Sequence, residues 1–216
     1  MPWPAKNRKE HLCSFLCLAM KQNSGALFDR KGKRKYLTQQ ERILIEKTAE
    51  KFPREVRTLI GVLVFTGCRI SEALVLSTDR IDLDDGVIVF ESLKKREKGI
   101  YRAVPVPPKI LDMLDLVHSV RETQDGGKRK NKVRLWGYSR TTAWRHIKDV
   151  LDAAGIKQSE KMSPKAFRHG FGVAAVSAGI PLNLVQRWLG HAQLTTTAIY
   201  AEAIGAEEKK IAERMW

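Results

Sequence analysis

Polar side chains that could act on an anionic substrate stand at short, regular separations in the last third of the chain. They fall into three groups: Lys165-x-x-Arg168-His169, Leu189-Gly190-His191 and Tyr200. An arginine always carries its charge and binds anionic oxygens through two parallel hydrogen bonds. A tyrosine is a nucleophile once its phenol, whose ordinary pKa is about 10, gives up its proton. Taken singly, each residue also fits a solvated helix face, a helix end or a core aromatic.

A fourth group, Gly67-x-Arg69-x-x-Glu72, precedes these three in the chain. In this order and spacing, the four groups resemble the catalytic domain of the tyrosine recombinase (phage integrase) family. The resemblance covers roughly residues 37–205. It implies a DNA breaking-rejoining fold that is mainly α with a small antiparallel β-sheet.

The resemblance implies a transesterification on double-stranded DNA. Tyr200 would attack the scissile phosphate, form a 3′-phosphotyrosine bond and release a 5′-hydroxyl. Arg69 and Arg168 would stabilise the negative charge that builds up on the non-bridging oxygens, and His191 would donate a further hydrogen bond. No carboxylate cluster and no phosphate-binding Gly-rich loop accompanies these residues, so we expect neither a metal nor a nucleotide cofactor.

The remaining roles are less specific. The family takes a proton for the 5′-oxygen from a lysine in a β-hairpin loop, and Lys94 stands at about the matching distance, with Lys95 as the second candidate. Lys165 occupies a position where many members have a histidine, which leaves open which group accepts the proton of the tyrosine. Glu72 and His169 are expected to support the arginines and the tyrosine.

The net charge of the chain points to the same partner. Among 216 residues, 39 are Lys or Arg and 24 are Asp or Glu, a formal net charge of +15. Residues 1–38 hold nine basic and two acidic residues, residues 94–102 five and one, and residues 121–148 nine and two. The basic residues are concentrated in three stretches and are not spread evenly along the chain, which favours a polyanionic partner.

Two of these basic stretches contain candidate DNA contacts. In the hairpin loop, Lys95, Arg96 and Lys98 could bind the phosphate backbone. A helix that enters the major groove by its N-terminus would present the residues near its start, which here are Arg140, Thr141, Thr142 and Arg145. An ordinary basic surface helix explains the second set equally well.

Periodicity and capping signals place the elements that carry these residues. Helices are predicted at residues 38–51, 53–64, 69–76, 110–120, 139–154, 164–178, 181–189 and 203–216. Strands are predicted at residues 87–90 and 101–106, and residues 79–85 form a turn-rich connector. Thr38, followed three residues later by Glu41, is the signature of a capping box.

The domain organisation follows from these elements. Residues 1–36 are predicted to be a basic arm, and residues 37–216 the catalytic domain with a tail helix. About 36 residues are too few for the helical core-binding domain of the family, so we expect one of its shorter members. The amphipathic tail, ending at Trp216, is expected to pack on another copy in a tetramer that holds two DNA sites.

Three functions remain open. The first is a site-specific recombinase of the integrase, invertase or resolvase type. The second is a type IB topoisomerase-like enzyme with the same chemistry, and the third is a catalytically impaired DNA-binding relic.

The cysteines suit a protein of the reducing cytoplasm. There are only three, and no framework of paired disulfides can be built from them. His11-x-Cys13-x3-Cys17 is at most half of a zinc site, since no second ligand pair stands near it. No stretch approaches the roughly 20 apolar residues of a membrane span.

Overall fold

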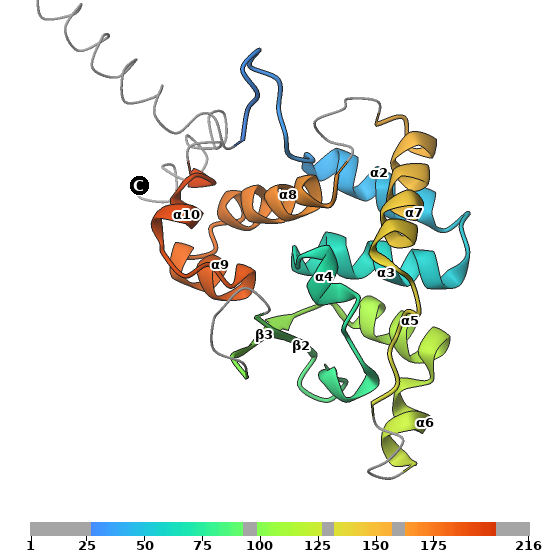
Figure 1. Ribbon diagram of the computed structural model, residues 1–216. Coiled ribbons are helices and arrows are strands. Elements are labelled where there is room, and N and C mark those ends of the chain that lie inside the picture. The colour runs from blue at the N-terminus through green and yellow to red at the C-terminus, as the bar shows by residue number, and fades with distance from the viewer. Residues whose placement is uncertain (1–26, 93–98, 127–131, 157–162, 202–216) are drawn as a thin grey trace, which may run out of the picture.

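A computed structural model describes residues 27–92, 99–126, 132–156 and 163–201 (Figure 1). The helices in these ranges are α2 (Gln39–Ala49), α3 (Arg54–Thr66), α4 (Ile70–Ala73), α5 (Pro108–His118), α6 (Val120–Asp125), α7 (Arg140–Ala153), α8 (Pro164–Ser177), α9 (Leu182–Leu189) and α10 (Thr195–Ala198), with a 3₁₀ turn at Thr78–Arg80. The strands are β1 (Ile81–Asp82), β2 (Val87–Glu91) and β3 (Tyr101–Pro105), in one antiparallel sheet of order β1-β2-β3. The predicted fold class, mainly α with a small antiparallel sheet, is confirmed.

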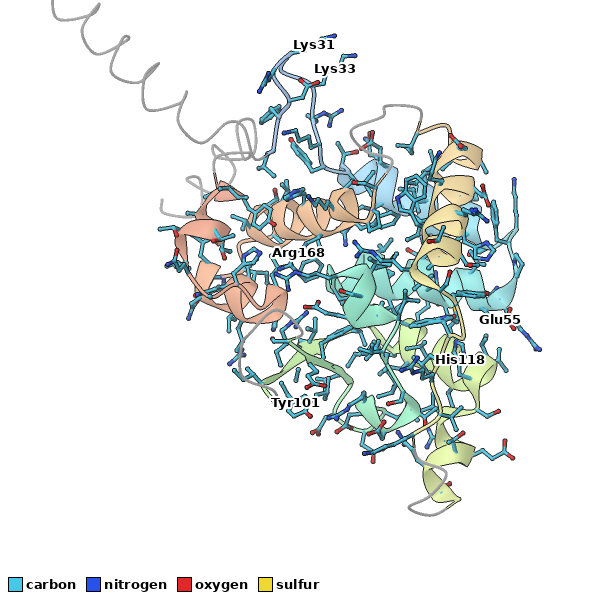
Figure 2. All side chains as sticks on the ribbon, viewed as in Figure 1. Lys31, Lys33, Glu55, Tyr101, His118 and Arg168 are labelled. Carbon is cyan, nitrogen blue, oxygen red and sulfur yellow. The ribbon has the colours of Figure 1, made fainter. Side chains whose placement is uncertain are left out.

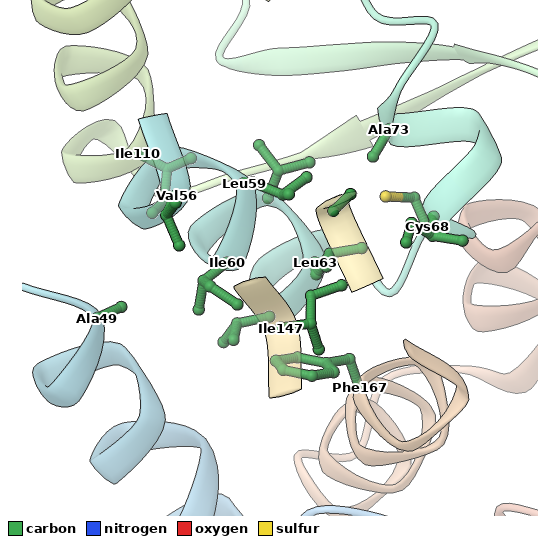
Figure 3. Packing of buried hydrophobic residues seen from close by; sticks show 14 of the residues in the cluster. Ala49, Val56, Leu59, Ile60, Leu63, Cys68, Ala73, Ile110, Ile147 and Phe167 are labelled. Atoms are coloured by element: carbon green, nitrogen blue, oxygen red, sulfur yellow. The ribbon is translucent and has the colours of Figure 1, made fainter. Parts of the chain in front are cut away.

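Helix α3 forms the centre of the core. Its sequence is apolar on nearly every face, as expected of a helix surrounded by other elements. It packs against α2, α5, α7 and α8. Figure 3 shows Leu59, Ile60 and Leu63 of α3 among Ile147 of α7 and Phe167 of α8, and all five side chains are fully buried.

The helix boundaries follow the capping signals. The Thr38 hydroxyl accepts a hydrogen bond from the Glu41 amide at 3.2 Å, and the Glu41 carboxylate accepts one from the Thr38 amide at 2.8 Å. The predicted capping box is therefore present at the start of α2. Ser139 caps α7 in the same way, by accepting from the Thr142 amide at 3.0 Å.

Two local predictions were wrong. The connector at residues 79–85 contains β1, which pairs with β2. Its two residues are too few to show an alternating pattern in the sequence. The helix predicted at residues 110–120 breaks at Ser119, whose φ of +48° is left-handed, and α6 then continues in another direction.

Helices α5 and α6 lie on a different side of α3 and α4 from the last helices. Figure 1 shows α8, α9 and α10 gathered on one side of the molecule, with α5 and α6 on the opposite side. The end of α9 packs against β3, so the sheet also contacts the C-terminal elements. In the β2–β3 pair, Phe90 stands opposite Arg102, and the predicted lysine-bearing loop follows at residues 93–98, outside the described residues.

A second apolar cluster joins the ends of the described chain. Leu27 and Tyr36 pack with Phe171 of α8, Leu189 of α9 and Tyr200. Residues 1–26 and the predicted tail helix at 203–216 lie outside the described residues. No helix in the described ranges is both long and apolar enough to cross a membrane.

Candidate active site

The first predicted arginine is set by the turn between α3 and α4. Helix α3 ends at Gly67, whose φ is +59°, and a Cβ atom there would lie 2.8 Å from the Phe171 side chain. Only glycine meets both conditions without strain. The chain then turns, and Arg69 caps α4 with about a quarter of its side chain exposed.

Glu72 holds Arg69 in place. Its carboxylate accepts from Arg69 Nη1 at 2.7 Å and from the Arg69 amide at 2.8 Å. The same carboxylate accepts from Arg102 Nη2 at 2.7 Å. Burial alone would raise the pKa of Glu72, but the Arg102 charge and the hydrogen bonds from both arginines outweigh it and hold that pKa below its usual value. Glu72 is therefore an anion that fixes two guanidinium groups.

The second predicted arginine lies where α8, α9 and the α3–α4 turn meet. Figure 2 shows Arg168 pointing from α8 toward this junction. Its Nη1 donates to the Gly67 carbonyl at 3.1 Å and its Nη2 to the Leu189 carbonyl at 2.6 Å. Burial, and to a smaller extent the nearby Arg69 charge, lowers the pKa of Arg168 to about 10. Two cations whose charges act on each other favour the binding of an anion between them.

His191 and Tyr200 complete the site. The ring of His191 stacks on that of Tyr200 with centroids 6.3 Å apart and planes 17° apart. His191 Nδ1 is hydrogen-bonded to Thr197 Oγ1 at 2.9 Å. When Thr197 donates this bond, the neutral imidazole carries its proton on Nε2 and can donate it to an oxyanion.

The tyrosine is held against α8. Only 1% of Tyr200 is exposed, and its phenol oxygen lies 3.3 Å from His169 Nδ1. Burial raises the pKa of Tyr200, while the charges of Arg168 and Arg69 act in the opposite direction. The fold therefore gathers Arg69, Arg168, His191 and Tyr200, the four residues that the motifs single out, and His169 contacts the phenol.

Gly172 makes room for the tyrosine. A Cβ atom at this position would lie 2.6 Å from Tyr200 Cε2 and Cζ. We expect Gly172→Ala to lower the free energy of unfolding by about 1–3 kcal/mol, as overpacking does. Thermal or urea unfolding measures the change. Most of this cost should disappear in a Tyr200→Ala background, and Gly137→Ala, where a Cβ meets nothing within 4 Å, is the control. Equal costs in both backgrounds would contradict this packing.

Two histidines of the site should make stability depend on pH. Burial, then the Arg168 charge, lowers the pKa of His169 to about 4 and that of His191 to about 3. The unfolded chain binds these protons near pH 6.5 and the folded chain does not, so stability is present above pH 6.5 and is lost as the pH falls toward 4. We expect a loss of about 1 kcal/mol per histidine between pH 7 and pH 5, after allowance for solvent screening.

Urea unfolding at pH 5, 6 and 7 measures this loss. The variants His169→Gln and His191→Gln should each show a shallower dependence on pH than the unsubstituted chain. Identical slopes in all three proteins would mean that folding does not lower the pKa of either ring.

The other predicted residues are not gathered at this site. Lys165, one turn before His169 on α8, is exposed, and its charge contributes to the lowered pKa of His169. Arg140, Thr141 and Arg145 are exposed on α7. Thr142 is half-buried, with its hydroxyl hydrogen-bonded to Ser139. The hairpin residues Lys94, Lys95, Arg96 and Lys98 lie outside the described residues.

Sequence reasoning missed Arg102 and Thr197. Arg102 stands at an inward position of β3, in phase with Val104, where a strand normally carries an apolar residue. That exception to the alternation was a usable signal. Thr197 lies within three adjacent threonines, and nothing in the sequence distinguishes it from its neighbours.

The described residues contain no group of three or more His, Cys, Asp or Glu side chains that could hold a metal ion. Cys68 is buried beside the site, and burial raises the pKa of its thiol to about 12. The half zinc site considered from the sequence, at residues 11–17, lies outside the described ranges.

Comparisons with known proteins relate this chain, by its sequence and its fold, to a family. Tyrosine recombinase XerA of Pyrococcus furiosus is 31% identical over 189 residues, which are 83% of this chain and 61% of XerA. The chain thus spans about three fifths of the length of that relative. A crystal structure of XerA recombinase superposes with a TM-score of 0.67 at 24% identity, over 83% of this chain and 64% of the other.

A second solved structure is the XerH site-specific recombinase bound to its difH substrate in a pre-cleavage complex. It gives a TM-score of 0.64 at 22% identity, over 91% of this chain and 62% of the other. At these identities the two structures establish a shared fold. The sequence model of the phage integrase family matches residues 33–206. The chain belongs to the phage integrase family, the tyrosine recombinases, and residues 33–206 carry the match.

Proposed function

We propose that this protein is a site-specific DNA recombinase that cleaves and rejoins DNA through a 3′-phosphotyrosine bond at Tyr200. One observation carries the proposal: elements far apart in the sequence bring two guanidinium groups and a neutral imidazole around a single phenol. Arg69 and Arg168 are close enough to act on the pKa of Tyr200, and the His191 ring stacks on it. A phosphate placed between the two arginines and His191 would meet three donors, and it would meet the nucleophile once the phenol is exposed.

The proposed reaction depends mainly on stabilisation of the negative charge that develops on the phosphate. As the Tyr200 oxygen attacks phosphorus, negative charge grows on the two non-bridging oxygens. Arg69 and Arg168 bind these oxygens, and His191 donates from Nε2. The carboxylate of Glu72 and the carbonyls of Gly67 and Leu189 already orient the guanidinium groups, so the two arginines reorganise little during the reaction.

Two protons must move. The phenol proton leaves Tyr200 as the bond forms, through His169, whose Nδ1 lies 3.3 Å away, or through Lys165 one helical turn earlier. The 5′-oxygen takes up a proton as its bond to phosphorus breaks. Lys94, or Lys95 beside it, is our candidate for that donor.

The tyrosine must also reach the DNA. Because 99% of Tyr200 is covered in the chain without DNA, its oxygen cannot contact a phosphate from this position. We propose that DNA binding draws the segment around α10 outward far enough to expose the phenol oxygen. Cleavage would then depend on correct assembly with the DNA site.

Double-stranded DNA and further copies of the chain are the proposed partners. Support comes from the family, from the XerH structure with its DNA substrate, and from the uneven basic charge. The exposed Arg140, Thr141 and Arg145 of α7 are proposed to contact the DNA, together with the hairpin loop. In the tetramer, residues 203–216 are proposed to pack on a neighbouring copy.

A covalent-capture experiment tests the function. The protein is incubated with a pool of nicked duplexes of random sequence, and DNA that stays attached in denaturing detergent is sequenced. We expect an enriched site, and two copies of that site on one plasmid should recombine. Relaxation of a plasmid without the site would favour the topoisomerase-like enzyme. DNA binding with no covalent complex would indicate the impaired relic.

A further inference from the structure

We propose that Arg102 is a positioning residue that fixes both phosphate-binding arginines relative to each other. The inference rests on the proposed function, since it concerns the same site. Arg102 comes from β3, an element that contributes none of the four groups proposed to contact phosphate or nucleophile. Its guanidinium nevertheless donates to Glu72, which also binds Arg69. It also donates to the Trp188 carbonyl, which is next to the Leu189 carbonyl that binds Arg168.

The contact with the Arg69 side is an ion pair. Arg102 Nη2 donates to Glu72 Oε2 at 2.7 Å and Nη1 to Oε1 at 3.5 Å, and the two side chains are 4% and 1% exposed. The same two carboxylate oxygens accept from Arg69. Glu72 is therefore shared, and the direction of its carboxylate, on which Arg69 depends, is set by Arg102.

The contact with the Arg168 side is a hydrogen bond to backbone. Arg102 Nε donates to the Trp188 carbonyl at 2.8 Å. The next carbonyl, of Leu189, accepts from Arg168 Nη2 at 2.6 Å. A Cβ atom on Gly190 would lie 3.2 Å from the Arg102 guanidinium, so this turn packs directly on it. The same turn leads into His191.

A planar guanidinium is required for both contacts at once. Its Nε points to α9 while its Nη atoms face Glu72, and the group lies 5.1 Å from the centre of the Phe90 ring below. A lysine keeps the charge but has a single nitrogen, which cannot reach the carboxylate and the carbonyl in the same geometry. Arg102→Lys therefore removes the link and preserves the ion pair.

Single-turnover cleavage of a nicked duplex carrying the captured site tests the role. We expect Arg102→Lys to slow covalent capture at least tenfold, with DNA affinity within about threefold of the unsubstituted chain. Glu72→Gln, which weakens the link from the other side, should show the same pattern. The matched control is Arg80→Lys, because Arg80 stacks on Tyr101 of the same strand and lies outside the network. Its cleavage rate should be unchanged.

A second substrate separates this role from proton donation. A sulfur atom replaces the bridging 5′-oxygen at the scissile phosphate, and the resulting thiolate leaves without a proton. Sulfur should restore cleavage by Lys94→Ala and should not restore cleavage by Arg102→Lys. Restoration of the Arg102→Lys rate by sulfur, or a rate within twofold of the unsubstituted chain on the ordinary duplex, overturns the inference.

A purely structural role gives a different result. Ile88→Ala creates a cavity in β2 of the same sheet, where Ile88 is fully buried, and it is expected to lower the unfolding temperature without slowing cleavage below that temperature. If Arg102→Lys slows cleavage only in proportion to its loss of stability, as judged against Ile88→Ala, the inference is wrong. If the unsubstituted chain forms no covalent complex on any duplex, the proposed function fails and the inference falls with it.

Discussion

Replacing Tyr200 with phenylalanine is expected to lower the rate of covalent DNA capture by a factor of at least about 10³. The affinity for DNA should stay within about twofold of that of the unsubstituted chain. The reason is chemical, because phenylalanine keeps the ring that packs on Gly172 and stacks on His191 but has no oxygen to attack phosphorus. The lost hydrogen bond, to His169 at 3.3 Å, is a long one, so the fold should survive. Nicked-duplex capture and a gel-shift titration measure the two quantities.

Tyr101→Phe is the matched control for this variant. Tyr101 lies on β3 with 46% of its surface exposed and is not part of the proposed site. It should capture DNA at the rate of the unsubstituted chain. If Tyr200→Phe also captured DNA at that rate, another residue would be the nucleophile.

Replacing Arg168 with alanine is expected to have the next largest effect. Removal of one oriented donor to a developing oxyanion costs about 10²–10³ in rate. Stability should also fall, by about 1–3 kcal/mol, because the buried carbonyls of Gly67 and Leu189 lose their donor. Single-turnover cleavage, run below the unfolding temperature of the variant, measures the loss in rate.

The comparison with Lys165 makes this prediction sharper. Lys165 lies on the same helix as Arg168, one turn earlier, but its side chain is exposed. Lys165→Ala should slow cleavage less than Arg168→Ala. Equal losses would mean that the lysine is as central as the arginine, and would favour Lys165 over His169 as the proton acceptor.

Much of the fold could be predicted from local signals. The capping box at Thr38, the proline that begins α8 and the glycines that end helices act through neighbouring residues, so the sequence alone reveals them. Strand β1 could not be found this way, because its two residues are held by pairing with β2. The break at Ser119 was missed because a serine carries no strong sequence signal for a left-handed turn.

The spacing of short motifs was enough to predict the four central residues of the candidate site. Arg69, Arg168, His191 and Tyr200 were identified together from four short motifs. Their supporting contacts were less accessible, because Arg102 meets Glu72 and Trp188 only through tertiary packing. The 3.3 Å approach of His169 to the phenol likewise depends on how α8 and α10 pack. Residue types indicate the chemistry, but burial and long-range contacts decide which neighbour each group meets.

The most direct measurement identifies the residue that becomes joined to DNA. A covalent complex trapped on a nicked duplex is digested with nuclease and protease, and the peptide that carries a nucleotide is sequenced by mass spectrometry. The account predicts a nucleotide on the phenol oxygen of Tyr200, attached through its 3′-phosphate. A nucleotide on any other side chain, or attachment through a 5′-phosphate, would contradict it.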